Sequence, residues 1–175
     1  MICPYCKYEN IAGADTCENC SQDLTGHEQP HARSAMELSM MEASITELGP
    51  KPPVIVSRET TVAEVIDKLR EHHIGCVLVG SVDKVVGIFS ERDALLRVAN
   101  RYEDAAELPI THFMTADPEQ LDEGAPIAFA LNRMSVGHFR HLPVTRDGKL
   151  EGIISLRDIL GFLSEWYPDL IPAKP

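Results

Sequence analysis

An internal repeat with a fixed offset of 65 residues constrains the fold of this chain more than any other sequence feature. Adding 65 takes Ile45 to Ile110 and Val79 to Val144, with no gap between. Each copy reads as a strand, a helix, two strands joined by a hairpin turn, and a second helix. Two such β-α-β-β-α units with apolar faces are expected to pack together as a pseudo-twofold pair, so we predict an α+β fold.

The repeat and the changes in composition around it divide the 175 residues into four segments. Residues 1–25 are rich in cysteine and too short to fold around a core of their own without added stabilisation such as a bound metal ion or a disulfide. Residues 26–44 begin as a polar linker and continue as a Met-rich stretch, whose apolar spacing predicts an amphipathic helix lying on the next domain. The two copies of the repeat are predicted to occupy residues 45–109 and 110–170.

A heptapeptide recurs in the two copies, as GIFSERD at 87–93 and GIISLRD at 152–158. In each copy a strand leads to a turn, a serine stands at the N-cap of a helix, and an aspartate follows three residues later. Ser-x-x-Asp is a capping-box pattern, in which the acidic side chain reaches back to the N-cap amide. Helix capping alone would explain Ser90 with Asp93 and Ser155 with Asp158.

Other residues of the heptapeptide indicate a ligand cleft. Gly87 and Gly152 lie just inside the strand ends, where a missing side chain lets another group approach the backbone. Arg92 and Arg157 fall in the first helical turn, which is unfavourable for a cation unless an anion is nearby; a surface salt bridge is the alternative explanation. A helix N-terminus also attracts phosphate. Amides and a hydroxyl could thus hold a phosphate while the carboxylate accepts both ribose hydroxyls.

These motifs, with HFRHLPV at 138–144 and FMTADP at 113–118, resemble a tandem pair of CBS domains, also called a Bateman module. The resemblance covers about residues 45–165. It implies a regulatory protein that binds an adenosine compound such as AMP, ADP, ATP or S-adenosylmethionine. By the same resemblance, Asp93 and Asp158 would hold ribose hydroxyls, and Ser90 and Ser155 would lie near the phosphates. It also implies a homodimer, since CBS pairs commonly associate into disc-like dimers.

The two clefts are predicted to differ, because the second copy has Arg140 and His141 where the first has Gly75 and Cys76. In the CBS family a basic residue just before LPV often reaches a phosphate. Arg140 and His141 are therefore candidates for the polyphosphate end of the ligand, and solvent exposure or an ion pair is the alternative. We interpret Cys76 as a small buried hydrophobic residue rather than a reactive thiol.

Two Cys-x-x-Cys pairs, CPYC at 3–6 and CENC at 17–20, stand at the start of the chain. Such a pattern places four thiolates around one tetrahedral ion, and the segment resembles short structural zinc ribbons; iron is the alternative metal. It departs from those ribbons in having Lys7 and Ser21 where glycine usually follows each pair. CPYC also resembles a glutaredoxin site, but that role needs a preceding strand. The predicted metal ligands are Cys3, Cys6, Cys17 and Cys20.

The charge balance argues against several classes of function. The chain carries 27 acidic and 16 basic residues, a formal charge of −11 that repels nucleic acid and anionic membranes.

No run of eighteen apolar residues and no secretory signal is present, so we expect a cytoplasmic protein. The sequence contains no nucleophile elbow, P-loop or His-rich catalytic metal site, so we expect no enzymatic activity.

Three hypotheses follow from the sequence. The first is a non-catalytic nucleotide sensor whose zinc ribbon serves structure or docks an unknown protein partner. The second is a ligand-free scaffold, in which the repeats only dimerise and the Ser-x-x-Asp pairs only cap helices. The third is a thiol redox protein, which would require Cys3 and Cys6 to be free of metal.

Overall fold

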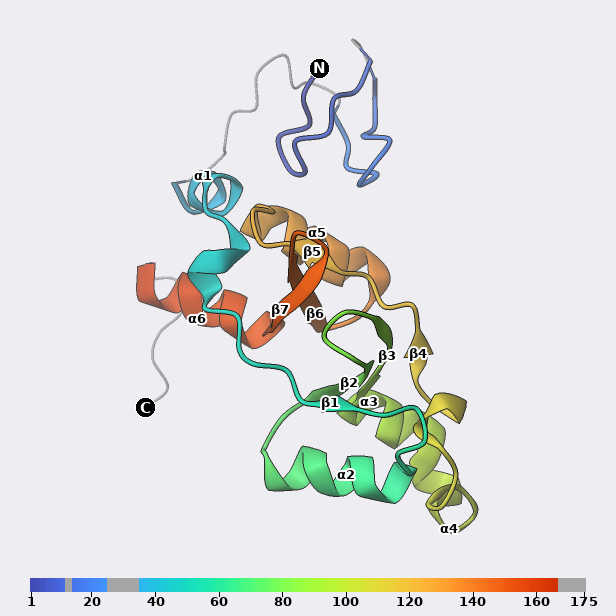
Figure 1. Cartoon of the computed structure of the whole chain (residues 1–175). Helices are drawn as coiled ribbons and strands as arrows, with labels where there is room; N and C mark the ends of the chain where they lie inside the picture. The colour runs from blue at the N-terminus through green and yellow to red at the C-terminus, as the bar shows by residue number, and fades with distance from the viewer. Residues whose placement is uncertain (12–13, 25–34, 167–175) are drawn as a thin grey trace. The chain divides into compact units, whose positions relative to one another are not determined.

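The computed structural model describes residues 1–11, 14–24 and 35–166 (Figure 1). Residues 26–34 of the predicted linker and residues 167–170 of the predicted second repeat lie outside the described residues. The fold is of the mixed α+β class with two sheets, as predicted.

The chain divides into two compact units, and each combines segments that are distant in sequence. The first contains Met1–Pro50, Leu121–Leu142 and Ile154–Pro175, and the second contains Lys51–Gln120 and Pro143–Ile153. No helix among the described residues is long and apolar enough to cross a membrane.

The first sheet has four strands in the order β1-β2-β3-β4, formed by Ile55–Val56, Cys76–Gly80, Val85–Ser90 and Thr115–Ala116. Strand β1 runs parallel to β2, as expected for strands joined by a crossover helix. Strands β2 and β3 are antiparallel and place Cys76 opposite Ser90. Strand β4 is antiparallel to β3 and places Ala116 opposite Gly87. Part of the FMTADP motif at 113–118 therefore supplies an edge strand to the first sheet.

The second sheet has three strands in the order β5-β6-β7, formed by Leu121–Asp122, His141–Arg146 and Lys149–Ser155. Asp147 and Gly148 connect β6 to β7 and have φ angles of 50° and 76°. Two consecutive residues with positive φ are typical of a two-residue hairpin turn, and Asp-Gly suits it because both tolerate this conformation. The predicted hairpin is confirmed.

Three helices follow strands of the repeats, at Val62–Glu71 (α2), Ile127–Gly137 (α5) and Leu156–Trp166 (α6). Helix α2 begins after Thr61, whose N–H donates to Glu64 Oε2 at 2.9 Å in a capping box. Helix α5 ends at His138, which takes the left-handed conformation that terminates many helices.

The predicted Met-rich helix is present as α1 (Ala35–Glu42) and lies against α5 (Figure 1). Met40 and Met41 are buried on it. A 3₁₀ turn, η1 (Ile45–Leu48), follows, and Ile45 N–H donates to the carbonyl of Ala125 at 2.9 Å. The start of the first repeat is thereby fixed to the segment that leads into α5.

The helix predicted after the first heptapeptide is not continuous. It consists of α3 (Glu91–Asp93), a π-helical turn η2 (Ala94–Val98), a 3₁₀ turn η3 (Ala99–Arg101) and α4 (Tyr102–Ala105). A further 3₁₀ turn, η4 (Ile110–His112), leads into β4. In this irregular part, Arg97 Nη1 donates to the carbonyl of Phe113, and the Arg101 guanidinium lies over the Phe113 ring. These contacts join segments that are distant in sequence and compete with regular helix geometry.

The first sheet and its helices enclose one apolar core. Phe89 on β3 is fully buried at its centre. The core residues come from β1, α2, β2, β3 and the irregular helix, and from η4 beyond it: Val56, Val62, Val65, Leu69, Val77, Val79, Phe89, Val98, Ala105, Ile110 and Phe113. Because the core includes the strand that ends at Ser90, it fixes the backbone from which the first heptapeptide emerges.

Candidate functional site

The N-terminal segment is built from two structurally equivalent turns, 14 residues apart in sequence. Lys7 N–H donates to the carbonyl of Cys3 at 3.0 Å, and Ser21 N–H donates to that of Cys17 at 2.8 Å. Isolated antiparallel bridges, Ile2 with Glu9 and Thr16 with Asp23, close the two turns in the same way. Each turn presents two thiols on one side, so a pair of turns can surround a single ion.

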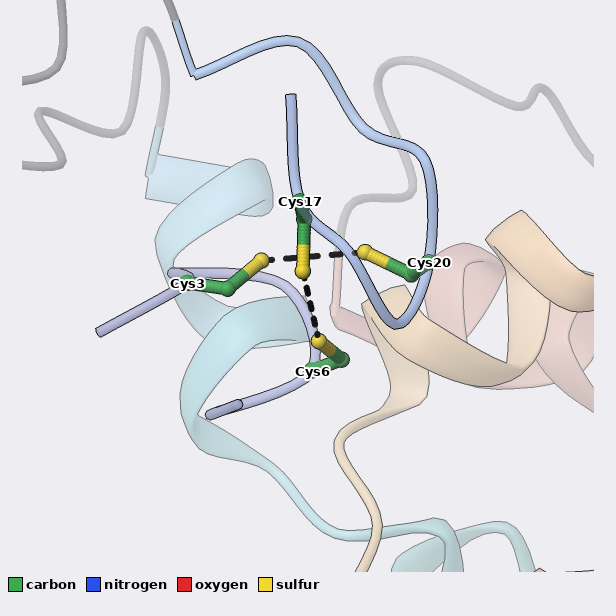
Figure 2. Close-up of side chains that lie close together, drawn as sticks. All are labelled: Cys3, Cys6, Cys17 and Cys20. Atoms are coloured by element: carbon green, nitrogen blue, oxygen red, sulfur yellow. Dashed lines mark hydrogen bonds between the residues drawn. The ribbon is translucent and has the colours of Figure 1, made fainter. Parts of the chain in front are cut away.

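The four cysteine sulfurs converge on one point, and Figure 2 shows them turned toward one another. All four Sγ atoms lie within 4.8 Å of each other; Cys3 is 3.7 Å from Cys20, and Cys6 is 3.5 Å from Cys17. Four sulfurs at about 2.3 Å from a tetrahedral Zn²⁺ would be separated by roughly 3.8 Å. The arrangement therefore fits a tetrahedral metal ion, and it unites all four predicted ligands.

Burial and hydrogen bonds shift the pKa values of three cysteines in this cluster. Burial raises the pKa of the Cys3 and Cys20 thiols. Burial also acts to raise the pKa of Cys17, but hydrogen bonds from the Cys20 backbone and the Asn10 side chain outweigh it and lower the pKa to about 6. Cys17 is therefore a thiolate at neutral pH, which is the form that binds metal.

Asn10 is a structural residue of this cluster that the sequence analysis missed. Its side chain is buried; Nδ2 contacts Cys17 Sγ at 3.5 Å, and Oδ1 accepts from Glu18 N–H at 2.9 Å. It thus ties the first turn to the second. The 14-residue spacing places Asn10 at the position equivalent to Leu24, which is also buried, and this equivalence could have identified it.

Helix α5 contacts the N-terminal segment within the first compact unit. Phe129 packs against the cluster of Cys3, Cys17, Cys20 and Leu24. Asn132 Nδ2 on the same helix donates to Gln22 Oε1 at 2.9 Å. One face of the cysteine cluster is therefore covered by a helix of the second repeat.

Replacing Lys7 or Ser21 by glycine will tighten metal binding. Both residues have left-handed φ angles, 61° and 57°, which cost a residue with a Cβ about 1 kcal/mol that glycine avoids. We expect each glycine variant to bind Zn²⁺ about 2- to 5-fold more tightly in a chelator competition. Alanine at either position keeps the Cβ and serves as the control. Equal affinities for the glycine and alanine variants would contradict this prediction.

The first heptapeptide forms the predicted capping box. Asp93 Oδ2 accepts from Ser90 N–H at 3.0 Å and from Ser90 Oγ at 2.7 Å, and Asp93 N–H lies 3.4 Å from Ser90 Oγ. The other carboxylate oxygen, Oδ1, lies 3.4 Å from Arg97 Nε. The capping interpretation is confirmed, and it occupies one of the two carboxylate oxygens.

The second heptapeptide repeats this geometry. Asp158 Oδ2 accepts from Ser155 N–H at 2.7 Å and from Ser155 Oγ at 2.6 Å. Arg92 and Arg157, at equivalent positions in the first helical turn, are both exposed. In the structure each predicted serine thus contacts its predicted aspartate, and the two arginines are exposed to solvent.

One backbone hydrogen bond links each heptapeptide to the strand beside it. Glu91 N–H donates to the carbonyl of Gly75 at 3.0 Å, and Leu156 N–H donates to that of Arg140 at 2.9 Å. Arg140 is exposed directly before β6, and His141 is half-buried at its start. The second motif therefore has a basic side chain next to it, whereas the equivalent position in the first carries none.

The surroundings of the first motif are tighter than the sequence predicted. Gly87 does allow a close approach, but the approaching group is Met114, whose Sδ would collide with a Cβ at that position. Cys76 is buried opposite Ser90, and burial with the charges of Glu91 and Asp93 raises its pKa to about 12. Cys76 is therefore a neutral thiol at physiological pH, in keeping with its interpretation as a buried hydrophobic residue.

Comparison with known families agrees with the duplication. The model of the CBS domain matches twice, at residues 45–100 and 110–165. The chain belongs to the CBS domain family. An uncharacterized 17.7 kDa protein in the bps2 3′ region of Acidianus ambivalens is 34% identical over 121 residues, which cover 68% of this chain and 72% of that protein.

Solved CBS structures share the fold. The CBS-domain containing protein ATU1752 from Agrobacterium tumefaciens is 29% identical with a TM-score of 0.64, covering 69% of this chain and 98% of that one. The CBS domain protein PAE2072 from Pyrobaculum aerophilum, solved as a complex with AMP, is 26% identical with a TM-score of 0.58, covering 70% and 99% of the two chains. The CBS pair thus accounts for residues 45–100 and 110–165.

Proposed function

We propose that this protein is a non-catalytic regulator that binds an adenosine nucleotide at its CBS repeats. CBS-domain pair proteins are generally regulatory. The observation that carries the proposal is the duplicated Ser-x-x-Asp motif, in which Oδ2 of Asp93 and Oδ2 of Asp158 accept from a serine amide and hydroxyl. The serine thereby fixes each carboxylate at a helix N-terminus, where it could receive ribose hydroxyls.

The second motif is the better supported of the two. The carbonyl of Arg140 accepts a hydrogen bond from Leu156 N–H at the start of α6. The Arg140 side chain therefore begins beside Ser155 and Asp158. Arg140 and the exposed Arg157 supply positive charge for phosphates in a chain of formal charge −11, and His141 lies beside Arg140 at the start of β6. The related protein PAE2072 was solved with AMP, which supports an adenosine ligand here. ADP, ATP and S-adenosylmethionine are the other candidates.

Such a regulator works by population shift. A ligand can move an equilibrium between two arrangements of the repeats only by as much as its affinity for them differs. Because the heptapeptides join strands to helices, a nucleotide held there would bias the orientation of both elements. An unknown protein partner would bind one of these orientations in preference to the other.

We further propose that the N-terminal segment is a structural zinc ribbon. The sulfur separations of 3.5 and 3.7 Å fit a tetrahedral site, and α5 covers one face of the cluster through Phe129. Iron would fit the same four sulfurs. The alternative, a thiol redox role for Cys3 and Cys6, predicts metal-free protein.

Titration calorimetry with AMP, ATP and S-adenosylmethionine tests the nucleotide proposal. We expect saturable binding of at least one of them, with a matching rise in the thermal midpoint because a ligand that binds only the folded state stabilises it. Protein that is folded but gives neither heat nor a midpoint shift would overturn the proposal. That result would favour the ligand-free scaffold.

We propose that the CBS pairs form a homodimer through the helices that follow the motifs. Leu95 and Leu160 occupy equivalent positions in the two repeats and are 72% and 47% exposed. Apolar side chains at both equivalent positions are what a recurring contact would bury. Replacing both by glutamate will weaken the dimer at least about tenfold, as measured by light scattering over a concentration series. Val82→Glu, at an exposed hairpin position, should leave the dimer intact.

A further inference from the structure

Helix α5 carries an aromatic residue at the position where the equivalent helix of the first repeat carries a capping acid. The 65-residue offset takes Thr61 and Glu64, which form the capping box of α2, to Pro126 and Phe129. Pro126 is the N-cap residue of α5 and makes no side-chain hydrogen bond there. A helix without its cap is less stable, so the second repeat has Phe129 in place of a stabilising local interaction.

Phe129 makes its contact with the N-terminal segment instead. Several partly buried side chains pack against the apolar cluster formed by the cysteines and Leu24. Among the described residues, Phe129 is the one of these that comes from outside residues 1–24. Its counterpart Glu64 is exposed. Because a segment of this length has little apolar surface to bury, an added aromatic contact is a large fraction of its packing.

Asn132, one helical turn after Phe129, makes a polar contact with the same segment. Its Nδ2 donates to Gln22 Oε1 at 2.9 Å, and the carbonyl of Gln22 accepts from Cys17 N–H at 2.8 Å. The counterpart of Asn132 in α2 is Asp67, whose side chain is 63% exposed. Asn132 Oδ1 is buried without a hydrogen-bond partner among the described residues, which offsets part of the gain from Gln22. Phe129 should therefore contribute more than Asn132.

We infer that α5 is a working part of the metal centre: Phe129 and Asn132 bind the metal-loaded N-terminal segment, so that affinity for Zn²⁺ depends on the second CBS repeat and bound metal stabilises α5. A small metal-binding segment folds as it binds its ion, so every contact that needs the folded segment adds to the affinity for the metal. The linkage is reciprocal, because the metal must then stabilise the helix that makes the contact. Both parts belong to the first compact unit. This inference rests on the zinc proposal above.

Exchanging α5 residues for their first-repeat counterparts tests the contact. Phe129→Glu removes the aromatic ring without weakening the start of the helix, because an acid there interacts favourably with the helix dipole. We expect the affinity for Zn²⁺ in a chelator competition to fall about 10-fold, and Asn132→Ala to lower it about 2- to 3-fold. The matched control is Val136→Glu, which places the counterpart Glu71 at a position of α5 that is 56% exposed. It should bind Zn²⁺ as the unaltered protein does.

Hydrogen exchange tests the reciprocal effect on the helix. In the unaltered protein, removal of zinc by a chelator should speed amide exchange in α5 about tenfold and leave α2, the equivalent helix of the other compact unit, unchanged. In Phe129→Glu, removal of zinc should change neither helix. If Phe129→Glu does not fold, as judged by its thermal transition, Phe129→Ala replaces it, with an expected loss of Zn²⁺ affinity of about 5-fold.

The possible results separate this inference from the zinc proposal. Unchanged Zn²⁺ affinity in the folded Phe129 variant, an equal loss in Val136→Glu, or exchange in α5 that does not respond to the chelator would overturn the inference and leave the zinc proposal standing. Absence of zinc binding by the unaltered protein would overturn both.

Discussion

Replacing Asp158 by alanine will lower the affinity for adenine nucleotide at least about tenfold. Hydrogen bonds from ribose hydroxyls to a charged carboxylate contribute about 1.5–3 kcal/mol each, and 1.4 kcal/mol corresponds to a factor of ten. The measurement is titration calorimetry with the nucleotide that binds the unaltered protein. Unchanged affinity in a folded Asp158→Ala protein would show that this carboxylate caps its helix and does nothing more.

The control for this experiment must lose a helix cap without losing a ligand contact. Glu64 provides it, because Glu64 Oε2 accepts from Thr61 N–H at 2.9 Å and from Thr61 Oγ1 at 3.2 Å, just as Asp158 accepts from Ser155. Loss of either cap should cost about 1 kcal/mol and lower the thermal midpoint by a few degrees. Glu64→Ala should nevertheless bind nucleotide as the unaltered protein does.

Removing the metal will unfold the N-terminal segment while the CBS repeats stay folded. Protein purified without added metal should contain about one zinc per chain, and binding of structural zinc contributes on the order of 10 kcal/mol to the folding of such small units. After treatment with a strong chelator, circular dichroism should retain most of its signal, because the CBS repeats have an apolar core of their own. Cys17→Ser should prevent metal retention altogether.

Thiol counting provides a sharp readout for the same experiment. No cysteine should react rapidly with a thiol reagent in the metal-bound protein, four should react after chelation, and five only in denaturant. The fifth is Cys76, which is 7% exposed and has its pKa raised to about 12, so it stays a neutral, inaccessible thiol in the folded repeat. Reactive Cys3 and Cys6 in protein that was never chelated would favour the redox alternative, and absorbance in the visible range would identify iron instead of zinc.

The features predicted correctly from the sequence are those that local chemistry determines. Ser-x-x-Asp forms a capping box because donor and acceptor are separated by one helical turn, whatever surrounds them. The Asp147-Gly148 turn follows from the ability of both residues to take positive φ. The cysteine cluster follows from two short spacings that are repeated after 14 residues.

The features that the sequence analysis missed depend on contacts between distant segments. Nothing local marks Thr115–Ala116 as an edge strand of the first sheet, because its partner β3 lies about 28 residues earlier. The break in the helix after Asp93 likewise depends on Arg97 and Arg101 bonding to Phe113 and Met114. The sequence analysis did not single out Arg97. Comparing both repeats position by position would have singled it out, since its counterpart is Phe162.

The bond from Glu91 N–H to the carbonyl of Gly75, and its counterpart from Leu156 N–H to Arg140, uses main-chain atoms only. Each repeat therefore keeps its shape whichever amino acid projects from that position. Glycine in one half and arginine in the other show how widely this choice can vary. A duplicated architecture of this kind can change what it recognises by a single codon, and its two halves can come to respond to different molecules without either having to fold anew.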